Sequence, residues 1–288
     1  MKKIIDLSSH NTVTNWKLIK ESVDAVIIRL GYRGYSKGNI AYDTKFDEYR
    51  DALENNGIPY GVYFFPCSVN ENEANEEADF IISALKDCHI KFPVYLDSEV
   101  ADVKYGNGRA DKLSKELRTS LLIAIGSRLE VAGYKVGVYG STSWLNTKLD
   151  MSRLQDFDVW VAQYASACTY KGNYRIWQYT RKGYFAGVQG NVDESKAIDM
   201  VFENVNIYPE PTRNLQKKLI NMRGEDVKWV QFELIRHGFM STVNSKGKSN
   251  IDGIFGKDTD ASVRAFQRKV KIKVDGIVGV NTRKYLKM

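Results

Sequence analysis

Two acidic residues follow an apolar run in the segment PVYLDSEV (residues 93–100), at Asp97 and Glu99. The run Val94–Leu96 predicts a buried strand. Alternate residues on an extended chain share a face, so the two carboxylates would point the same way with Cα atoms about 7 Å apart. Like charges on one face repel and are costly to remove from water, so the pairing predicts a site where one carboxyl stays protonated.

Acidic, basic, amide and aromatic side chains also stand at or near the ends of other predicted strands. They are Asp6, Arg29, Tyr63, Tyr139, Trp160, Gln178 and Asp193. One such residue alone is more often a capping or core residue, but their recurrence at successive strand ends indicates a site. Carboxylates beside aromatic rings suit glycoside hydrolysis, in which one acid protonates the leaving oxygen and another supports an oxocarbenium-like transition state. A magnesium or calcium site is the competing use of clustered acids.

The elements that would position these residues alternate between strands and helices. The predicted strands are Ile4–Asp6, Ala25–Arg29, Tyr60–Phe64, Val94–Leu96, Lys135–Tyr139, Val159–Gln163, Arg175–Tyr179 and Asn191–Asp193. Apolar residues recur at helical spacing over 46–53, 74–85 and 117–132. This order predicts an α/β fold, a parallel (β/α) TIM-like barrel with irregular helices in its last third. In such a barrel the carboxyl ends of the strands meet on one rim, which would gather the polar side chains.

The last quarter of the chain differs from the rest. Pro209 and Pro211 predict a stiff linker over 207–214, between a catalytic barrel at 1–206 and a second domain at 215–288. In the second domain, DGIFG at 252–256 returns as DGIVG at 275–279. Helical patterns near 226–237, 258–270 and 280–287 predict a small all-α three-helix domain. Asp258 is the expected N-cap of its middle helix.

The charge is divided unevenly between the two parts. Residues 1–212 hold 25 Lys and Arg against 28 Asp and Glu, whereas residues 213–288 hold 17 against 7. The net charges are therefore −3 and +10, so the second domain favours an anionic partner. The sequence pI near 9.0 makes a nucleic-acid-binding protein an alternative hypothesis for the function. The larger part is net acidic and lacks interleaved basic and aromatic residues, so no nucleic-acid partner is expected.

Several kinds of site are not indicated by the residue types present. Three cysteines and three histidines, without HExxH or CxxC spacing, predict no zinc site. No phosphate-binding loop is present, and no cofactor or metal is expected. No apolar run approaches the roughly 20 residues of a membrane span, and the start of the chain lacks the apolar segment of a signal peptide.

A series of motifs resembles glycoside hydrolase family 25, the Chalaropsis-type lysozymes. It consists of DLSSHN (6–11), IIRLGY (27–32), GVYFF (61–65), YLDSE (95–99), GVYGS (137–141), WVAQY (160–164), IWQYT (176–180) and GNVD (190–193). Residues 222–288 resemble the peptidoglycan-binding domain 1 family through their paired DGxxG turns. The resemblance implies a barrel that cleaves the β-1,4 bond between N-acetylmuramic acid and N-acetylglucosamine in bacterial peptidoglycan.

The resemblance also implies roles for the acidic residues. Glu99 matches the proton donor, and Asp97 matches the acid that orients the substrate N-acetyl group or otherwise supports the nucleophilic step. Asp6 and Asp193 match the two other acids of the family's site. The positions that match its lining are Tyr63, Tyr139 and Trp160, and we add Gln178 and Arg29 as substrate-binding candidates. Phe64 stands where many members carry a histidine, which puts one substrate contact in doubt.

The mechanism stays open at the level of sequence. Substrate assistance by the acetamido oxygen with retention is favoured, and water activation by Asp6 or Asp193 with inversion is the alternative. The function alternatives are a catalytically inactive wall-binding protein, an autolysin and a chitinase-like glycosidase. The leading hypothesis is a phage endolysin, made in the cytoplasm without a signal peptide and acting on the wall after release.

The expected partners are peptidoglycan and anionic wall polymers. Two further hypotheses concern the second domain. One is self-association of the protein through this domain. The other is a translation restart at Met222, which would give a free binding domain that joins the full chain.

Overall fold

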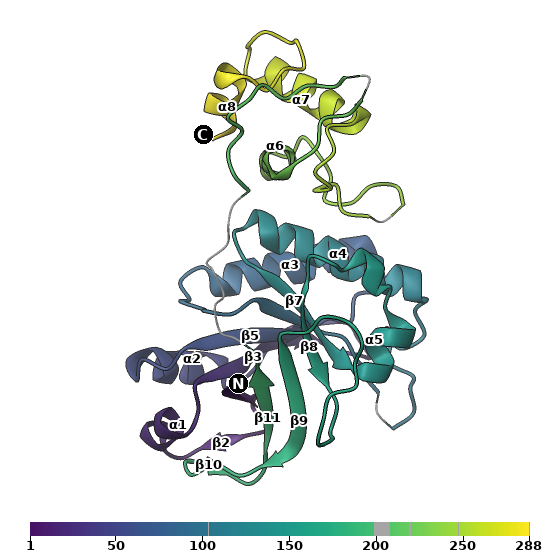
Figure 1. The fold of residues 1–288 in the computed structure, drawn as a ribbon. Helices are drawn as coiled ribbons and strands as arrows, with labels where there is room; N and C mark the ends of the chain where they lie inside the picture. Colours follow the sequence, from purple (N-terminus) through teal and green to yellow (C-terminus); the bar gives the residue numbers. More distant parts are fainter. Residues whose placement is uncertain (103, 199–207, 219, 247, 288) are drawn as a thin grey trace. The chain divides into compact units, whose positions relative to one another are not determined.

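The computed structural model describes residues 1–288 except residues 103, 199–207, 219, 247 and 288 (Figure 1). The chain forms two compact units, one made mainly of residues 1–204 and one made mainly of residues 205–288. Among the described residues, no helix has the length and apolar character that a membrane crossing requires.

The first unit contains strands and helices in alternation (Figure 1). Its strands are β1 (Lys2–Leu7), β2 (Thr12–Val13), β3 (Ala25–Arg33), β4 (Ile40–Tyr42), β5 (Tyr60–Phe65), β6 (Val94–Asp97), β7 (Val136–Ser141), β8 (Asp158–Ala162), β9 (Ile176–Gly183), β10 (Val188–Gln189) and β11 (Val192–Ala197). Its helices are α1 (Trp16–Ser22), α2 (Phe46–Asn55), α3 (Glu71–Leu85), α4 (Lys115–Val131), α5 (Thr142–Lys148) and the 3-10 helix η1 (Met151–Arg153).

The strands close into a barrel. In the described part of the chain, eight strands follow one another in the order β1-β11-β9-β8-β7-β6-β5-β3, and β3 pairs with β1 to complete the ring. Each predicted strand overlaps one of these eight, so the predicted α/β barrel is confirmed. The short strand β4 pairs with β3 outside the ring, and β2 pairs with β10 in a separate two-stranded sheet.

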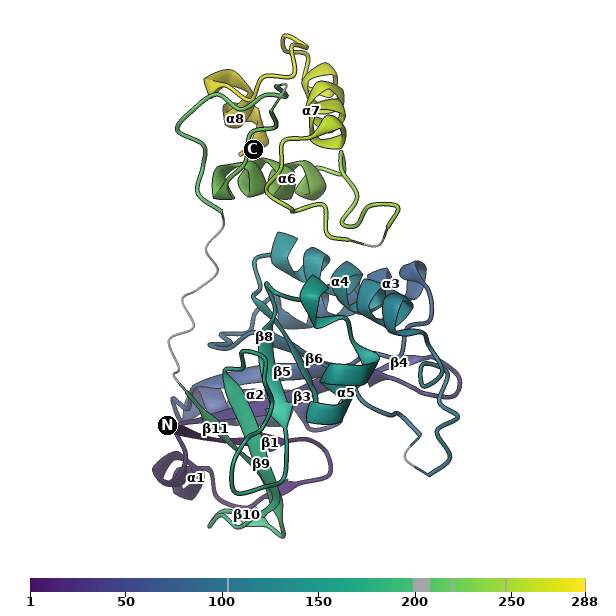
Figure 2. The ribbon, with the colours of Figure 1, turned by 45° about the vertical axis from the view of Figure 1, so that its right-hand side comes forward.

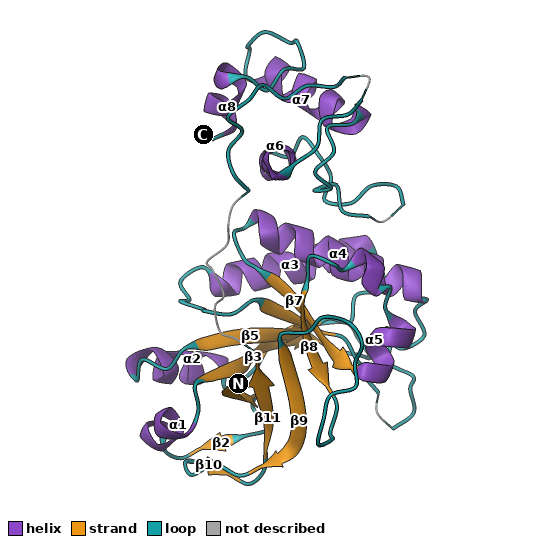
Figure 3. Cartoon of the chain, in the orientation of Figure 1, coloured by secondary structure: helices purple, strands orange, loops and turns teal. Residues whose placement is uncertain are grey.

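One strand runs against the expected direction. We predicted a wholly parallel barrel, but β11 is antiparallel to both of its neighbours, β9 and β1. The cause is the connection after β9, which spans only residues 184–191. A parallel connection needs a crossover of a dozen residues or more, whereas a short connection returns the chain antiparallel. The outer sides of β9 and β11 accordingly carry no helix among the described residues (Figure 3).

Helices flank the other side of the barrel, as Figures 2 and 3 show for α2, α3, α4 and α5. Helix α3 begins after Asn70, whose side chain accepts a hydrogen bond from the amide of Glu73. Four of the five apolar residues that the helical spacing predicted for its inner face, Ala74, Ala78, Ile81 and Leu85, are buried, and the fifth, Ile82, is partly exposed. Helix α4 ends just before Gly133, which has a φ of +95°, a conformation that other residues rarely adopt.

Aromatic rings fill the barrel interior. Trp160 on β8 is 2% exposed. Its ring lies 5.4 Å from Tyr95, 4.7 Å from Tyr139 and 6.3 Å from Tyr63, centroid to centroid, in edge-to-face geometry. Such pairs add roughly 0.5–1.5 kcal/mol each beyond their burial, so this cluster is a rigid base for the rim above it.

The second unit contains α6 (Glu225–Arg236), α7 (Lys257–Lys269) and α8 (Val280–Leu286), close to the predicted bounds. The expected N-cap role of Asp258 is wrong, because Gly256 occupies the N-cap and Asp258 lies within the first turn of α7. There its negative charge still favours the positive end of the helix dipole. The apolar core of this unit contains Leu215, Val227, Trp229, Val230, Leu234, Phe255, Val263, Phe266, Val278 and Leu286.

The DGxxG repeat is explained by one hydrogen-bond arrangement that occurs twice. In the second copy, the side-chain amide of Gln267 donates to Asp275 Oδ1, to the carbonyl of Ile277 and to Thr282 Oγ1, and its Oε1 accepts from the amide of Gly276. In the first copy, Gln231 makes the same four bonds. Its partners are Asp252, Ile254, Thr259 and Gly253. Each glutamine therefore joins one helix to the turn and to the start of the next helix.

Part of the predicted linker packs on the second unit. Residue 207 lies outside the described residues. Arg213 pairs with Asp226 at 2.7 Å, and Glu210 pairs with Lys287 at 3.0 Å. Pro211 is buried.

The same packing bears on the hypothetical restart at Met222. Leu215, which precedes Met222, is fully buried and exchanges backbone hydrogen bonds with Val278. A product beginning at Met222 would therefore lack a core residue of this unit, which disfavours the hypothesis.

Replacing Gln267 with leucine should destabilise the second unit. The substitution removes the hydrogen bonds that Gln267 makes with the amide of Gly276 and the carbonyl of Ile277. The loss should lower the free energy of unfolding by about 2 kcal/mol. Hydrogen exchange of the full chain should show faster exchange over residues 257–287. The matched control is Gln216→Leu, because the Gln216 side chain makes no hydrogen bond with the described part of the chain. Equal exchange in both variants would contradict a structural role for this arrangement.

Candidate active site

A cavity of about 100 Å³ opens at the carboxyl ends of the parallel strands. It is lined by Asp6, Tyr63, Asp97, Glu99, Tyr139, Trp160, Gln178 and Asp193. The structure thus brings together eight of the nine residues that the sequence singled out. The remaining one, Arg29, is not part of the lining. The individual catalytic roles of these residues stay predictions.

Two of the four acids form the buried floor of the cavity. Asp6 is 8% exposed and Asp97 is 7% exposed. Asp6 lies on β1, and in the antiparallel pairing of β1 with β11 it stands opposite Asp193. The side-chain amide of Gln178 donates to Asp6 Oδ2 at 2.9 Å. Burial and the charge of Asp193 raise the pKa of Asp6 well above its usual value, and the Gln178 bond partly opposes this rise.

Asp97, at the end of β6, is less well supported by hydrogen bonds. Its Oδ1 is buried and has no hydrogen-bond partner among the described residues. Burial raises the pKa of Asp97 well above its usual value, and the charges of Glu99 and Asp6 add to the rise. The Arg29 guanidinium lowers this pKa but does not reverse the shift. Asp97 therefore offers a free acceptor oxygen at a desolvated position, where a substrate N–H group would be a strong partner.

The other two acids lie nearer to solvent. Glu99 is open to solvent and Asp193 is half-buried. The pKa of Glu99 is raised by the desolvation that the cavity walls impose and then by the charge of Asp193. The sequence suggested that repulsion from Asp97 would keep one acid of the pair protonated. In the structure desolvation is the larger cause for both acids. The charge of Glu99 adds to the rise at Asp97, in line with the expected repulsion within the pair, and the charge of Asp193 on β11 adds to the rise at Glu99.

Hydrogen bonds fix the polar and aromatic lining. The hydroxyl of Tyr139 donates to Gln178 Oε1 at 2.9 Å, and the indole N–H of Trp160 donates to Ser195 Oγ at 3.1 Å. Gln178 in turn holds Asp6, so a continuous chain of bonds joins β7, β9 and β1. Burial raises the pKa of Tyr139 and that of Tyr63 well above the usual value, so both hydroxyls remain neutral donors.

Arg29 and Phe64 take positions beside the cavity rather than in its lining. Arg29 Nε pairs with Asp43 Oδ2 at 2.6 Å, and its Nη2 donates to Ser9 Oγ at 2.9 Å. Arg29 therefore acts on the site through its charge. Phe64 is fully buried and packs on Phe80 of α3, 5.8 Å between ring centroids. The next residue after the cavity-lining Tyr63 thus faces the helices, because side chains alternate along a strand.

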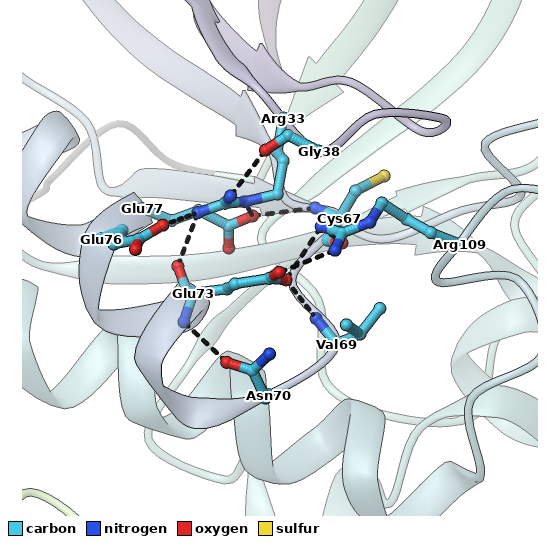
Figure 4. A network of polar contacts seen from close by, with 9 residues as sticks. All are labelled: Arg33, Gly38, Cys67, Val69, Asn70, Glu73, Glu76, Glu77 and Arg109. Carbon is cyan, nitrogen blue, oxygen red and sulfur yellow. Dashed lines mark hydrogen bonds and ion pairs between the residues drawn. The ribbon is translucent and has the colours of Figure 1, made fainter.

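The loop that follows Glu99 is held from within and from α3. Asp111 accepts hydrogen bonds from the amides of Ala101, Asp102 and Gly108. Arg109 pairs in a bidentate manner with Glu73 at 2.7 and 2.8 Å, and Figure 4 shows this pair beside Cys67. These bonds fix the chain on the carboxyl side of Glu99.

Arg33 is the centre of an ion-pair network in which the pair with Glu77 is buried and the pair with Glu76 reaches the surface (Figure 4). Arg33 donates to Glu77 Oε1 at 2.8 Å and to Glu76 Oε2 at 2.9 Å. Burial raises the pKa of Glu77 to about 7, against the opposing charge of Arg33. Since Glu77 also accepts from the amide of Cys67, the network secures the β5–α3 connection next to the site.

Sequence reasoning did not select two residues at the cavity mouth. Tyr164 donates to Gln178 Oε1 at 3.1 Å and is 53% exposed. The guanidinium of Arg181 lies 5.8 Å from the centre of the Tyr164 ring, and its charge lowers the pKa of Asp193. Tyr164 is the last residue of the WVAQY motif, and this position in a motif could have identified it as a site residue from the sequence. No sequence pattern pointed to Arg181, because its place near the site depends on the length of β9.

Each of the two units matches a known protein family. Residues 5–188 match the family described as "Glycosyl hydrolases family 25". Residues 223–286 match the family described as "Putative peptidoglycan binding domain". The chain is 24% identical over 283 residues to a protein of Clostridium acetobutylicum named "Autolytic lysozyme", covering 97% of this chain and 77% of that protein.

Solved structures show the same likeness. The modular autolysin LytC from Streptococcus pneumoniae, solved with a synthetic peptidoglycan ligand, has a TM-score of 0.60 and 32% identity. The match covers 67% of this chain and 46% of LytC, so the chain spans about half the length of that autolysin. A bacterial lysozyme from Streptomyces coelicolor has a TM-score of 0.57 at 21% identity, over 70% of this chain and 94% of that structure. The latter likeness shows the fold alone.

The Asp97→Asn variant should be more stable than the unchanged protein at neutral pH. A carboxyl whose pKa is raised by folding costs no stability below its unfolded pKa, near 4. The cost grows as the pH rises toward the folded pKa. The difference in melting temperature should therefore be near zero at pH 3.5 and positive at pH 7. Calorimetry at both pH values measures it, with the exposed Asp156→Asn as control. A variant that is less stable at pH 7 would contradict the desolvation argument.

Proposed function

The chain belongs to glycosyl hydrolases family 25, and from this membership we propose that it cleaves the β-1,4 bond between N-acetylmuramic acid and N-acetylglucosamine in bacterial peptidoglycan. It is a glycoside hydrolase of the lysozyme type, joined to a peptidoglycan-binding domain. The observation that carries this assignment within the structure is the cavity that gathers Asp6, Asp97, Glu99 and Asp193 beneath aromatic walls.

Glu99 is proposed as the general acid. It lies nearer to solvent than the floor acids, and its raised pKa favours the protonated form that must donate to the leaving oxygen. The acid loses this proton when the glycosidic bond breaks, and it regains a proton from the water that completes hydrolysis.

Asp97 is proposed to hold the substrate's acetamido group. Its Oδ1, which has no partner among the residues that the structure describes, can accept the amide N–H, which would turn the acetamido oxygen toward the anomeric carbon. That oxygen then acts as the nucleophile, and a second displacement by water restores the original anomeric configuration. Asp6 and Asp193 would support the positive charge that develops on the sugar. Water activation by Asp6 or Asp193 remains the competing scheme, and it inverts the configuration.

Glu99→Gln should lower turnover at least a hundredfold, because the amide cannot donate the required proton. Purified peptidoglycan is digested, the new ends are reduced with borohydride, and the reduced sugar is identified by mass spectrometry. Reduced muramic acid ends that vanish in the variant are the expected result. The exposed Glu116→Gln serves as control and should keep full activity. Reduced glucosamine ends would refute the bond assignment, and no new ends would favour a wall-binding protein without activity.

The first product should retain the β configuration. Proton NMR of the anomeric signals during the first turnovers of a soluble glycan distinguishes retention from inversion. An initial α product would exclude substrate assistance and assign water activation to Asp6 or Asp193.

The second unit is proposed to bind anionic wall polymers as well as peptidoglycan. Lys257, Arg268, Lys269, Lys271 and Lys284 are exposed on or beside α7 and α8. We expect the full-length Glu99→Gln variant to sediment with intact walls and to bind at least severalfold more weakly after anionic polymers are removed or salt is raised. Unchanged binding would restrict recognition to peptidoglycan.

Two further proposals concern the location of the protein and its self-association. We propose that it is made in the cytoplasm and acts on the wall after release, which fractionation before and after lysis would test. Self-association through the second unit also stays a prediction, and light scattering of the full chain over a concentration series checks it.

A further inference from the structure

Ser98, between the two acids of the DSE triplet, has a partner outside the cavity. Ser98 is 6% exposed, and its amide donates to the carbonyl of Tyr139 at 2.9 Å. Its hydroxyl oxygen accepts a hydrogen bond from the indole N–H of Trp144 at 3.0 Å. Ser98 lies between Asp97, the last residue of β6, and Glu99, so a bond that holds Ser98 restrains the backbone that carries both acids.

Trp144 is itself held in place. It lies on α5, where the hydroxyl of the N-cap residue Ser141 accepts from its amide at 3.1 Å. The guanidinium of Arg118, from α4, lies 4.8 Å from the centre of the indole ring. Arg118 is 6% exposed, so this cation–π contact is largely desolvated and correspondingly strong.

Arg118 connects the indole to the loop on the other side of Glu99. Its Nη2 donates to the carbonyl of Asp111 at 3.1 Å, and the carboxylate of Asp111 gathers the amides of the loop that follows Glu99. Arg118 also lines a cavity of about 20 Å³ together with Ser98 and Glu99. Trp144 and Arg118 thus support the DSE triplet from behind, while neither contributes to the cavity that holds the four acids.

We propose that Trp144 is a positioning residue for the Asp97–Glu99 pair, acting through its indole hydrogen bond to Ser98. The inference rests on the proposed muramidase function. Without the bond, the triplet can turn about the end of β6, and Glu99 then spends less time directed at the leaving oxygen. A displacement of about 1 Å at a reacting group can cost up to a hundredfold in rate.

The test compares Trp144→Phe, Ser98→Ala and the double variant in the full chain. Phenylalanine keeps an aromatic ring against Arg118 and removes only the donor. Each single variant should lower kcat about tenfold with KM nearly unchanged, and the double variant should fall no further than the singles, because both remove one bond. The basic limb of the pH–rate profile should also move to lower pH, as a less confined Glu99 is better solvated.

Controls separate this role from a structural one and from failure of the proposed function. Trp16→Phe, the same substitution on α1, should leave kcat and the pH profile unchanged. Melting temperatures show whether each variant is folded at the assay temperature. Additive losses in the double variant, an unchanged kcat in Trp144→Phe, or losses that only follow the unfolded fraction would overturn the proposal. An unchanged protein without muramidase activity would instead refute the proposed function.

Discussion

The desolvation of carboxylates at the barrel rim is the constraint on which the rest of this structure depends. Asp6 and Asp97 are almost fully buried, and burial is the largest cause of the raised pKa of each. A buried carboxyl that lacks full hydrogen bonding lowers stability at neutral pH, and the surrounding structure must offset that cost. The aromatic cluster around Trp160 and the bonds that join Tyr139, Gln178 and Asp6 supply the rigid support that keeps these acids in place.

The closure of the barrel arranges the acids on two levels. Parallel strands bring Asp97 to the floor and leave Glu99 two residues farther on, nearer to solvent. The antiparallel strand β11 adds Asp193 directly opposite Asp6 in register. A short return after β9 thus has a chemical consequence, because Asp193 raises the pKa of both Asp6 and Glu99. The strand that departs from the parallel pattern is the one that sets the charge across the cavity.

The second unit is stabilised by a hydrogen-bond arrangement that occurs twice, and not by a large core. At roughly 80 residues it can bury only a modest core, and small domains of this kind need additional specific interactions. Two glutamines with identical sets of hydrogen bonds join its helices and turns. The same turns place Gly253 and Gly276 at positive φ, where glycine is favoured. Residues 213–288 hold 17 Lys and Arg against 7 Asp and Glu, and this charge supports the proposal of an anionic partner.

The sequence by itself determined the alternation of strands and helices, the eight barrel strands and most of the candidate site. Apolar runs followed by polar residues mark strand ends, and the carboxyl ends of parallel strands must share a rim. The sequence could not determine the direction of β11, the N-cap of α7 or the place of Arg29, which is bound by Asp43 instead of lining the cavity. It also could not show that Asp193 adds its negative charge beside Glu99, or that Trp144 reaches Ser98. These features depend on contacts between residues distant in the chain, and only the closed barrel sets the distances on which charge interactions, desolvation and hydrogen bonds depend.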